Sequence, residues 1–305
     1  MGEAALLACD WGTTNLRAWT LDAEGRPLAS REFELGVSRL APGEAARRFA
    51  SEVQPALGAE RLPAILCGMV GSNLGWTVAP YADCPAGLDE LARAMVPVDA
   101  PGGWARIVPG LKSEGFGGLG DVMRGEETQL FGWLAQNPAR TRGRQLVCHP
   151  GTHAKWMVVE EGRLIRFVTA MTGELFAVLS RHSVLKSEAA ADDEAAFAEG
   201  LAAAGDGGAL AARLFTVRAR VVGQGRDPAG APSYLSGLLI GAEVASVPAL
   251  LGVEAHAPIA LLGDAGLCAR YGRAFEARGL AYETFDGEAA AIAGLFALYK
   301  MGAAS

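Results

Sequence analysis

The chain has 305 residues, of which 50% are hydrophobic and 20% are charged. This length and composition are typical of a globular protein with room for two compact lobes, and they exclude an intrinsically disordered chain. The net charge of −7 is spread without a basic block, which argues against nucleic acid or an anionic membrane surface as a partner. No apolar run is expected to reach the roughly 20 residues that span a bilayer. Five single cysteines without a paired motif indicate reduced core thiols in a cytoplasmic protein.

The first half of the chain predicts a small sheet covered by helices. Alternating or apolar runs predict strands at residues 5–10, 15–21, 27–34, 64–67 and 105–108. A helix is expected from Glu44 to Gln54, and a second helix from an N-cap at Asp121 to about Ala135. The linker-like residues 136–144 follow. They predict a boundary between an N-terminal lobe, residues 1–140, and a C-terminal lobe, residues 141–305.

The second half begins with a further strand-turn-strand unit and then becomes rich in helices. One helix is expected near Thr172, and exposed helices are expected within residues 187–212. Residues 233–250 predict an apolar helix in which Gly237 and Gly241 permit close packing. A buried strand at 258–263 and a final helix at 287–299 complete the expected elements.

A turn rich in glycine and threonine occurs twice, each time directly after a strand. The first strand ends at Asp10 and turns through Gly12-Thr13-Thr14, and the later strand ends at His149 and turns through Gly151-Thr152. Such turns let main-chain N–H groups and hydroxyls face an anion, and a carboxylate at the strand end can hold Mg²⁺ beside phosphates. An ordinary hairpin turn uses the same residue types. The second copy favours two jaws that close on the phosphates of a nucleotide.

These motifs resemble those of a known superfamily. Asp10-x-Gly-Thr-Thr-x-x-Arg17 resembles the first phosphate motif of the sugar-kinase, heat-shock-chaperone and actin superfamily, and His149–His153 falls where its second phosphate motif is placed. Leu261–Gly266 resembles its adenosine motif. More narrowly, the chain is similar to 2-dehydro-3-deoxygalactonokinases. The segments that carry this similarity together are Asp10–Arg17, Gly68–Asn73, Met123–Gln129, His149–Trp156, Met171–Glu174 and Tyr234–Glu243.

The resemblance implies a fold and an activity. The fold would be α/β, with two ribonuclease-H-like lobes of the actin-like ATPase fold and an active-site cleft between them. The activity would be the ATP-dependent phosphorylation of 2-dehydro-3-deoxy-D-galactonate to its 6-phosphate in galactonate breakdown, with ATP and Mg²⁺ as cofactors. Asp10 would hold the metal. The residues expected to contact ATP are Gly12, Thr13, Thr14, Asn15, Arg17, Gly151, Thr152, His153, Lys155, Gly263, Asp264 and Gly266.

Phosphoryl transfer also needs a base for the attacking hydroxyl and donors for a hydroxylated keto acid. Asp121 resembles the catalytic aspartate of hexokinase-like enzymes, although a plain N-cap explains it equally. Glu126 and Glu127 are the alternatives. Because arginine matches a carboxylate with paired donors, Arg124 is expected to assist. The residues expected to contact the sugar acid are Ser38, Arg39, Gly71, Ser72, Asn73, Trp76, Thr172 and Glu174, for several of which local capping is an alternative.

Other interpretations of the sequence are weaker. Gly115-x-Gly-x-x-Gly120 matches a dinucleotide fingerprint, but it does not open a helix directly after an N-terminal strand. Cys148, His149 and His153 suggest zinc, yet Pro150 and Gly151 break any helix that would align the histidines. The rival functions are another sugar kinase or a phosphatase of the superfamily, an ATP-gated assembly module, and a sugar-responsive repressor. A homo-oligomer is compatible with all of them.

Overall fold

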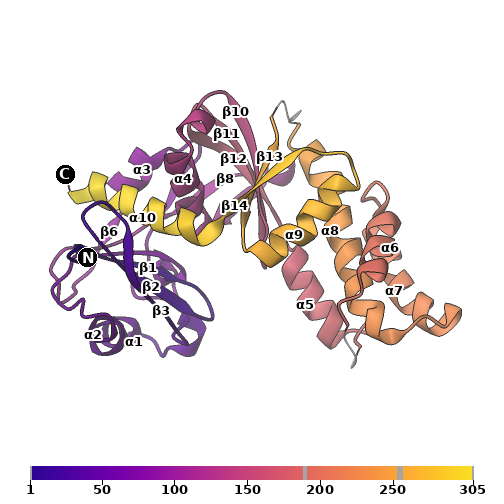
Figure 1. Cartoon of the computed structure of the whole chain (residues 1–305), viewed down its shortest axis with the longest axis horizontal. Helices are drawn as coiled ribbons and strands as arrows, with labels where there is room; N and C mark the ends of the chain where they lie inside the picture. Colours follow the sequence, from indigo (N-terminus) through magenta and orange to yellow (C-terminus); the bar gives the residue numbers. More distant parts are fainter. Residues whose placement is uncertain (1, 188–190, 253–256, 304–305) are drawn as a thin grey trace. The chain divides into compact units, whose positions relative to one another are not determined.

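The computed structural model describes residues 2–187, 191–252 and 257–303. The chain folds into two compact units (Figure 1). The first crossing between the units follows Gly143, close to the boundary predicted after Arg140. The last part of the predicted C-terminal lobe, however, returns to the first unit. The first unit comprises Met1–Gly143, Glu160–Arg166 and Gly287–Ser305, and the second comprises Arg144–Val159 and Phe167–Asp286.

The first unit is built on a six-stranded sheet with the order β3-β2-β1-β4-β7-β6. Its strands are β1 (Leu6–Trp11), β2 (Leu16–Leu21), β3 (Pro27–Phe33), β4 (Ala64–Gly68), β6 (Val96–Pro97) and β7 (Ala105–Ile107). β1, β2 and β3 pair antiparallel, whereas β4 is parallel to β1 and β7 is parallel to β4. The five strands predicted for this region all lie in this sheet and are confirmed. The short β6 was not predicted, nor were the three strands of a small third sheet.

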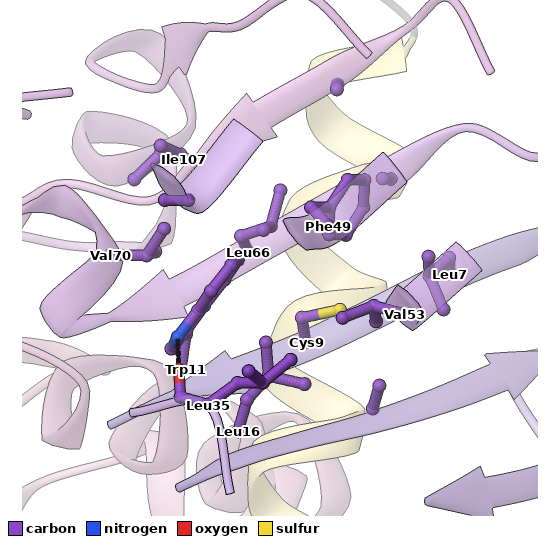
Figure 2. Packing of buried hydrophobic residues seen from close by; sticks show 14 of the residues in the cluster. Leu7, Cys9, Trp11, Leu16, Leu35, Phe49, Val53, Leu66, Val70 and Ile107 are labelled. Carbon is purple, nitrogen blue, oxygen red and sulfur yellow. Dashed lines mark hydrogen bonds between the residues drawn. The ribbon is translucent and has the colours of Figure 1, made fainter. Parts of the chain in front are cut away.

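The core of the first unit packs around Trp11 at the end of β1 (Figure 2). The Trp11 ring stacks on Phe49 with 6.4 Å between ring centroids. Its indole N–H donates a hydrogen bond to the Leu35 carbonyl, which satisfies the one polar atom that this large side chain buries. The helix predicted over residues 44–54 forms as α1 (Glu44–Arg48), a π-helical turn (Phe49–Val53) and α2 (Gln54–Ala56).

A small third sheet, with the order β5-β8-β9, corrects the prediction for Asp121. Its strands are β5 (Tyr81–Asp83), β8 (Gly110–Glu114) and β9 (Gly120–Met123). Asp121 lies within β9, opposite Ser113 of β8, so it is not a helix cap. The glycine-rich loop simply joins this β-hairpin through a 3-10 turn. Helix α4 (Glu126–Gln136) begins later, with Gly125 at its N-cap and a φ of 117°.

The final helix, α10 (Gly287–Ala303), packs against α4 and α3 (Leu88–Arg93) of the first unit (Figure 1). Two glycines allow α10 and α4 to approach closely. A Cβ added to Gly132 would lie 1.8 Å from the Ala290 carbonyl oxygen, and one added to Gly294 would lie 2.0 Å from the Thr128 carbonyl oxygen. This backbone contact is the physical reason that residues 287–303 belong to the first unit and not, as predicted, to the second lobe.

The second unit contains a five-stranded sheet with the order β12-β11-β10-β13-β14. Its strands are β10 (Arg144–His149), β11 (Ala154–Glu160), β12 (Arg163–Ala170), β13 (Ile259–Gly263) and β14 (Tyr282–Asp286). β13 is parallel to both β10 and β14. The order repeats that of β3-β2-β1-β4-β7 in the first sheet. The repeat seen in the sequence is therefore a repeat of the fold.

The helices of the second unit are α5 (Thr172–His182), α6 (Glu194–Ala204), α7 (Leu210–Gln224), α8 (Ala231–Leu250) and α9 (Ala265–Glu276). Helix α9 contacts β13 and β14 of the sheet, and the other helices pack on α8. The close packing predicted for Gly237 is confirmed, because a Cβ there would lie 2.1 Å from the Phe197 carbonyl oxygen of α6. Helix α6 is consequently half-buried and not exposed as expected.

Helix α8 with its preceding turn, Pro228–Leu250, is long and apolar enough to cross a membrane by length and composition, contrary to expectation. The apolar window of this segment is 72% buried inside the structure, and α8 contacts α5, α6, α7 and α9. Its apolar character is therefore explained by its position as the central helix of the second unit.

The contact between α4 and α10 can be tested with Gly294→Ala. The added methyl group cannot fit beside the Thr128 carbonyl, so we expect the free energy of unfolding to fall by about 1–3 kcal/mol, measured by urea denaturation. The matched control is Gly223→Ala in α7, where no atom lies within 4 Å of the added Cβ. We expect that control to be neutral or to stabilise the protein by about 0.5–1 kcal/mol. Equal effects of the two substitutions would contradict the packing argument.

Candidate functional site

The first glycine-threonine turn is held in shape by a second loop of the same unit. The Gly12 N–H donates to the Asn15 carbonyl at 2.9 Å, and the Gly36 N–H donates to the Thr14 carbonyl at 3.0 Å. A Cβ on Gly36 would lie 2.0 Å from the Thr14 carbonyl carbon, so no other residue fits there. Thr13 and Thr14 are exposed. The turn therefore presents its side chains to solvent from a fixed backbone.

Ser38 and Arg39, expected to contact the sugar acid, take part in local structure. The Ser38 hydroxyl donates to the Thr13 carbonyl at 2.7 Å, which secures the first turn. Arg39 forms an exposed ion pair with Glu34 at 2.9 Å. Asn15, expected at the nucleotide, donates from its side-chain amide to the Glu32 carboxylate at 2.6 Å. Local bonding thus accounts for these three side chains.

Asp10 lies at the end of β1, opposite Arg17 on β2. Its Oδ2 accepts a hydrogen bond from Arg17 Nη2 at 2.9 Å. The neighbouring strand β4 ends in Gly68, whose φ is +86°. A Cβ on Gly68 would lie 3.2 Å from Asp10 Oδ1 and 2.8 Å from the Trp11 carbonyl oxygen. The absence of a side chain at Gly68 keeps the edge of the sheet beside the Asp10 carboxylate open.

Glu127, at the start of α4, is brought to the same edge. A Cβ on Gly125 would lie 3.5 Å from Gly68 Cα, and the Gly125 N–H donates to both oxygens of Glu127 at 2.9 and 2.7 Å. Glu127 is fully buried. Burial, helped by the charge of Glu126, raises the pKa of Glu127 to about 7. Both glutamates were alternatives for the base from the sequence, which could not show that Glu127 is the buried one.

Asp121 and Arg124 lie on either side of the end of β9. Asp121 lines a cavity of about 630 Å³ within the first unit, together with Lys112 and Arg166. Arg124 Nη2 donates to the Ala79 carbonyl at 2.9 Å, and its guanidinium carbon lies 4.3 Å from the centre of the Tyr81 ring. The other two guanidinium nitrogens of Arg124, Nε and Nη1, are buried without a hydrogen-bond partner among the described residues.

The residues predicted around Ser72 have different environments. A Cβ on Gly71 would lie 2.8 Å from Arg124 Nη1, so this turn rests on the arginine. The Ser72 hydroxyl accepts the Leu74 N–H at 3.2 Å, which is local capping. Trp76 packs on Phe49 at 5.4 Å and belongs to the core. Asn73 is exposed.

The second glycine-threonine turn is also braced by a glycine, in this case at the start of α5. A Cβ on Gly173 would lie 2.5 Å from the Gly151 carbonyl oxygen. The Glu174 N–H donates to the Thr152 carbonyl at 2.9 Å, and the Glu174 carboxylate is hydrogen-bonded to His153. Helix α5 therefore fixes the turn between β10 and β11.

The adenosine-like motif lies beside this turn. A Cβ on Gly263 would lie 3.6 Å from the Pro150 carbonyl oxygen, because β13 runs parallel to β10. Asp264 caps α9 by accepting the Leu267 N–H at 3.0 Å, and Gly266 follows in the first turn of that helix. Lys155, on β11, is buried, and its ammonium group donates to the His153 carbonyl at 3.4 Å. The structure thus brings the second turn and the adenosine-like motif together.

A cavity of about 290 Å³ opens within the second unit between this turn and helices α5, α8 and α9. It combines apolar walls with a few polar groups, as small-molecule sites usually do. Gly151 and Thr152 were expected to contact ATP, whereas Thr172, which also lines this cavity, was expected to contact the sugar acid. Most of the other lining residues were not predicted, because they come from three helices that meet only in the folded protein. The lining residues are Gly151, Thr152, Thr172, Gly173, Phe176, Ser236, Leu239, Ile240, Leu267, Arg270 and Tyr271.

Comparison with known proteins identifies the family of the chain. Residues 10–298 match the family model described as 2-keto-3-deoxy-galactonokinase. The chain is 38% identical to a probable 2-dehydro-3-deoxygalactonokinase of Rhizobium meliloti (strain 1021), over 95% of each chain. It is also 38% identical to the 2-dehydro-3-deoxygalactonokinase of Escherichia coli (strain K12), over 96% of each.

Solved structures give the same result. A crystal structure from Sinorhizobium meliloti, of a protein named as a putative 2-dehydro-3-deoxygalactonokinase, has a TM-score of 0.84 and 37% identity over 97% of this chain and 98% of its own. Component A of the (R)-2-hydroxyglutaryl-CoA dehydratase of Acidaminococcus fermentans has a TM-score of 0.52 at 14% identity, with 99% of this chain and 100% of that chain covered. This second likeness shows the fold alone. The predicted actin-like α/β fold is confirmed, and the chain belongs to the 2-keto-3-deoxy-galactonokinase family.

Proposed function

We propose that this chain transfers the γ-phosphoryl group of ATP to the 6-hydroxyl of 2-dehydro-3-deoxy-D-galactonate, in the breakdown of galactonate. The observation that carries the proposal is family membership over residues 10–298. The cavity beside the Gly151–Thr152 turn supports it, because a phosphate-facing turn adjoins a space of nucleoside size. The nucleoside of ATP would occupy this cavity, and the main-chain N–H groups of the turn would face the phosphates.

Asp10 is the residue that would hold Mg²⁺. The residues present fit such an ion, because a carboxylate stands at the strand end and Gly68 places no side chain beside Asp10 Oδ1. Mg²⁺ is usually held by one or two carboxylates together with phosphates and water, so a closed cage of protein ligands is not required. When bound, the ion would neutralise charge on the phosphate oxygens. Arg17, which binds Oδ2 of Asp10, would orient the carboxylate.

We assign the base role to Glu127 in preference to Asp121. Glu127 follows Gly125, which lies against Gly68 beside Asp10, whereas Asp121 lies on the third sheet and lines the cavity that also contains Lys112 and Arg166. A base works best when its pKa is near the working pH, and the pKa of Glu127 is about 7. The carboxylate would exchange its bonds to the Gly125 N–H for the substrate hydroxyl and take up the hydroxyl proton as the phosphoryl group is transferred.

Arg124 would bind the carboxylate of the sugar acid. Its Nε and Nη1 are buried donors without a partner among the residues described. A buried donor that stays unpaired costs about 1–3 kcal/mol, so an anion that reached these atoms would recover that cost. The Tyr81 ring below the guanidinium keeps its plane fixed, which suits the paired geometry of a carboxylate.

The reaction can be tested by ADP release coupled to a second enzyme, across 3-deoxy-2-keto sugar acids and neutral hexoses. We expect turnover to depend on 2-dehydro-3-deoxygalactonate and the product to carry phosphate at position 6, identified by ³¹P NMR. Faster turnover with a neutral hexose would point to another sugar kinase. A rate of ADP release that does not change when any sugar or sugar acid is added would favour an ATP-gated assembly module.

The base can be identified by comparing Glu127→Gln with Asp121→Asn. We expect Glu127→Gln to lower kcat by roughly two to four decades and Asp121→Asn to change it little. In the unmodified enzyme kcat/KM should rise with pH and level off above about pH 7, where the pKa of Glu127 lies, because the base acts in its ionised form. Loss of activity confined to Asp121→Asn would return the role to that residue.

Recognition of the carboxylate can be tested with Arg124→Lys, which keeps the charge but removes the paired donors. We expect the KM for the sugar acid to rise by about tenfold or more, with the KM for ATP unchanged. Arg39→Lys is the matched control, because Arg39 already pairs with Glu34 at the surface. A larger effect at Arg39 than at Arg124 would reverse the assignment.

A further inference from the structure

Glu243 of α8 is a buried carboxylate that the proposed chemistry does not use. It is only 4% exposed. Its Oε1 accepts the Trp156 indole N–H at 2.7 Å, and its Oε2 accepts the Tyr271 hydroxyl at 2.7 Å. The Thr172 side chain provides a third hydrogen bond. A buried carboxylate is costly unless its acceptors are occupied, and here three donors occupy them.

The three donors come from three different elements around the cavity of the second unit. Trp156 is on β11, Thr172 begins α5, and Tyr271 is on α9. Thr172 and Tyr271 line the cavity. The residue after Thr172 is Gly173, which packs against the backbone of Gly151 and Thr152. Glu243 is thus linked through Thr172 to the turn that would face the phosphates.

We propose that Glu243 is a positioning residue for nucleotide binding, which holds the walls of the cavity and the Gly151–Thr152 turn in the arrangement that binds ATP. The inference rests on the proposed function in one respect, that this cavity holds the nucleoside of ATP. Glu243 does not contact the sugar acid or the transferred group in this scheme. Its effect reaches ATP through Thr172, Gly173 and Tyr271.

The chemistry of the three donors explains why a carboxylate is required at this position. The Trp156 indole can only donate a hydrogen bond, and an ionised carboxylate has only acceptor atoms. A glutamine of the same size would present its amide N–H to at least one of the donors. The Tyr271 and Thr172 hydroxyls would then have to rotate. The hydrogen bonds through which one side chain holds β11, α5 and α9 together would be weakened.

The test is Glu243→Gln, measured with both substrates and by direct binding. We expect the KM for ATP to rise by about tenfold, while kcat and the KM for the sugar acid change less than about threefold. Calorimetric titration with ADP, in the absence of the sugar acid, should show a matching loss of affinity. Tyr271→Phe removes the hydrogen bond from the Tyr271 hydroxyl to Glu243. It should therefore lower the affinity for ADP less in the Glu243→Gln variant, where this bond is already disturbed, than in the unmodified protein.

Two controls separate the possible results. Val53→Ala, in the buried cluster of the first unit, which contains none of the residues that line this cavity, lowers stability without touching these bonds. If it raises the KM for ATP as much as Glu243→Gln does, the inference is overturned. Arg270→Ala tests whether the cavity binds nucleotide at all. If it weakens ADP binding and Glu243→Gln does not, the positioning role fails alone. If neither weakens ADP binding, the nucleotide assignment itself fails.

Discussion

Both turns that would face phosphate depend on a glycine from another part of the same unit. Gly36 lies against the turn after β1, and Gly173 lies against the turn after β10, each so close to backbone atoms that a single methyl group cannot be placed. The contact fixes the turn without using the groups that a ligand would need. Donors that are already oriented before the ligand arrives require no rearrangement during the reaction. The rest of the candidate site, including Asp10 and the cavity walls, is arranged around these two fixed turns.

Much of the fold could be predicted because its signals are local. The apolar run Ala64–Gly68 and the pattern of β2 are read within a few residues, and the repeat of the turn motif predicted two strand-turn-strand units. Two predictions failed where contacts distant in sequence decided the structure. Asp121 follows a glycine-rich segment, which is where a helix cap is expected. In the structure its segment instead pairs with β8 as a strand. Nothing in the sequence of the last helix indicates which unit it joins. It joins the first unit because Gly132 of α4 lets the backbone of Ala290 approach closely.

In the candidate site, too, residues with a local sequence pattern could be predicted and residues brought together by distant contacts could not. Asp10, Gly12 and Gly151 were identified because their turns have a recognisable pattern. Phe176, Leu239 and Arg270 carry no such pattern, since each looks like an ordinary helix residue until α5, α8 and α9 enclose one cavity. Neighbouring positions of a helix point in different directions, so Glu126 and Glu127 cannot both face the same site. Which of them is buried depends on how α4 packs, and this could not be predicted from the sequence.

The return of α10 to the first unit affects how the protein is made. Residues 144–286 interrupt the first unit, apart from the short segment Glu160–Arg166. A chain that emerges from the ribosome therefore exposes all of the second unit before the first has its last helix. Until α10 arrives, the surface of α4 that carries Gly132 has no partner helix. The first unit cannot be completed until residues 287–303 have been synthesised, and a nascent chain halted shortly before residue 287 would lack the helix that covers this surface of α4.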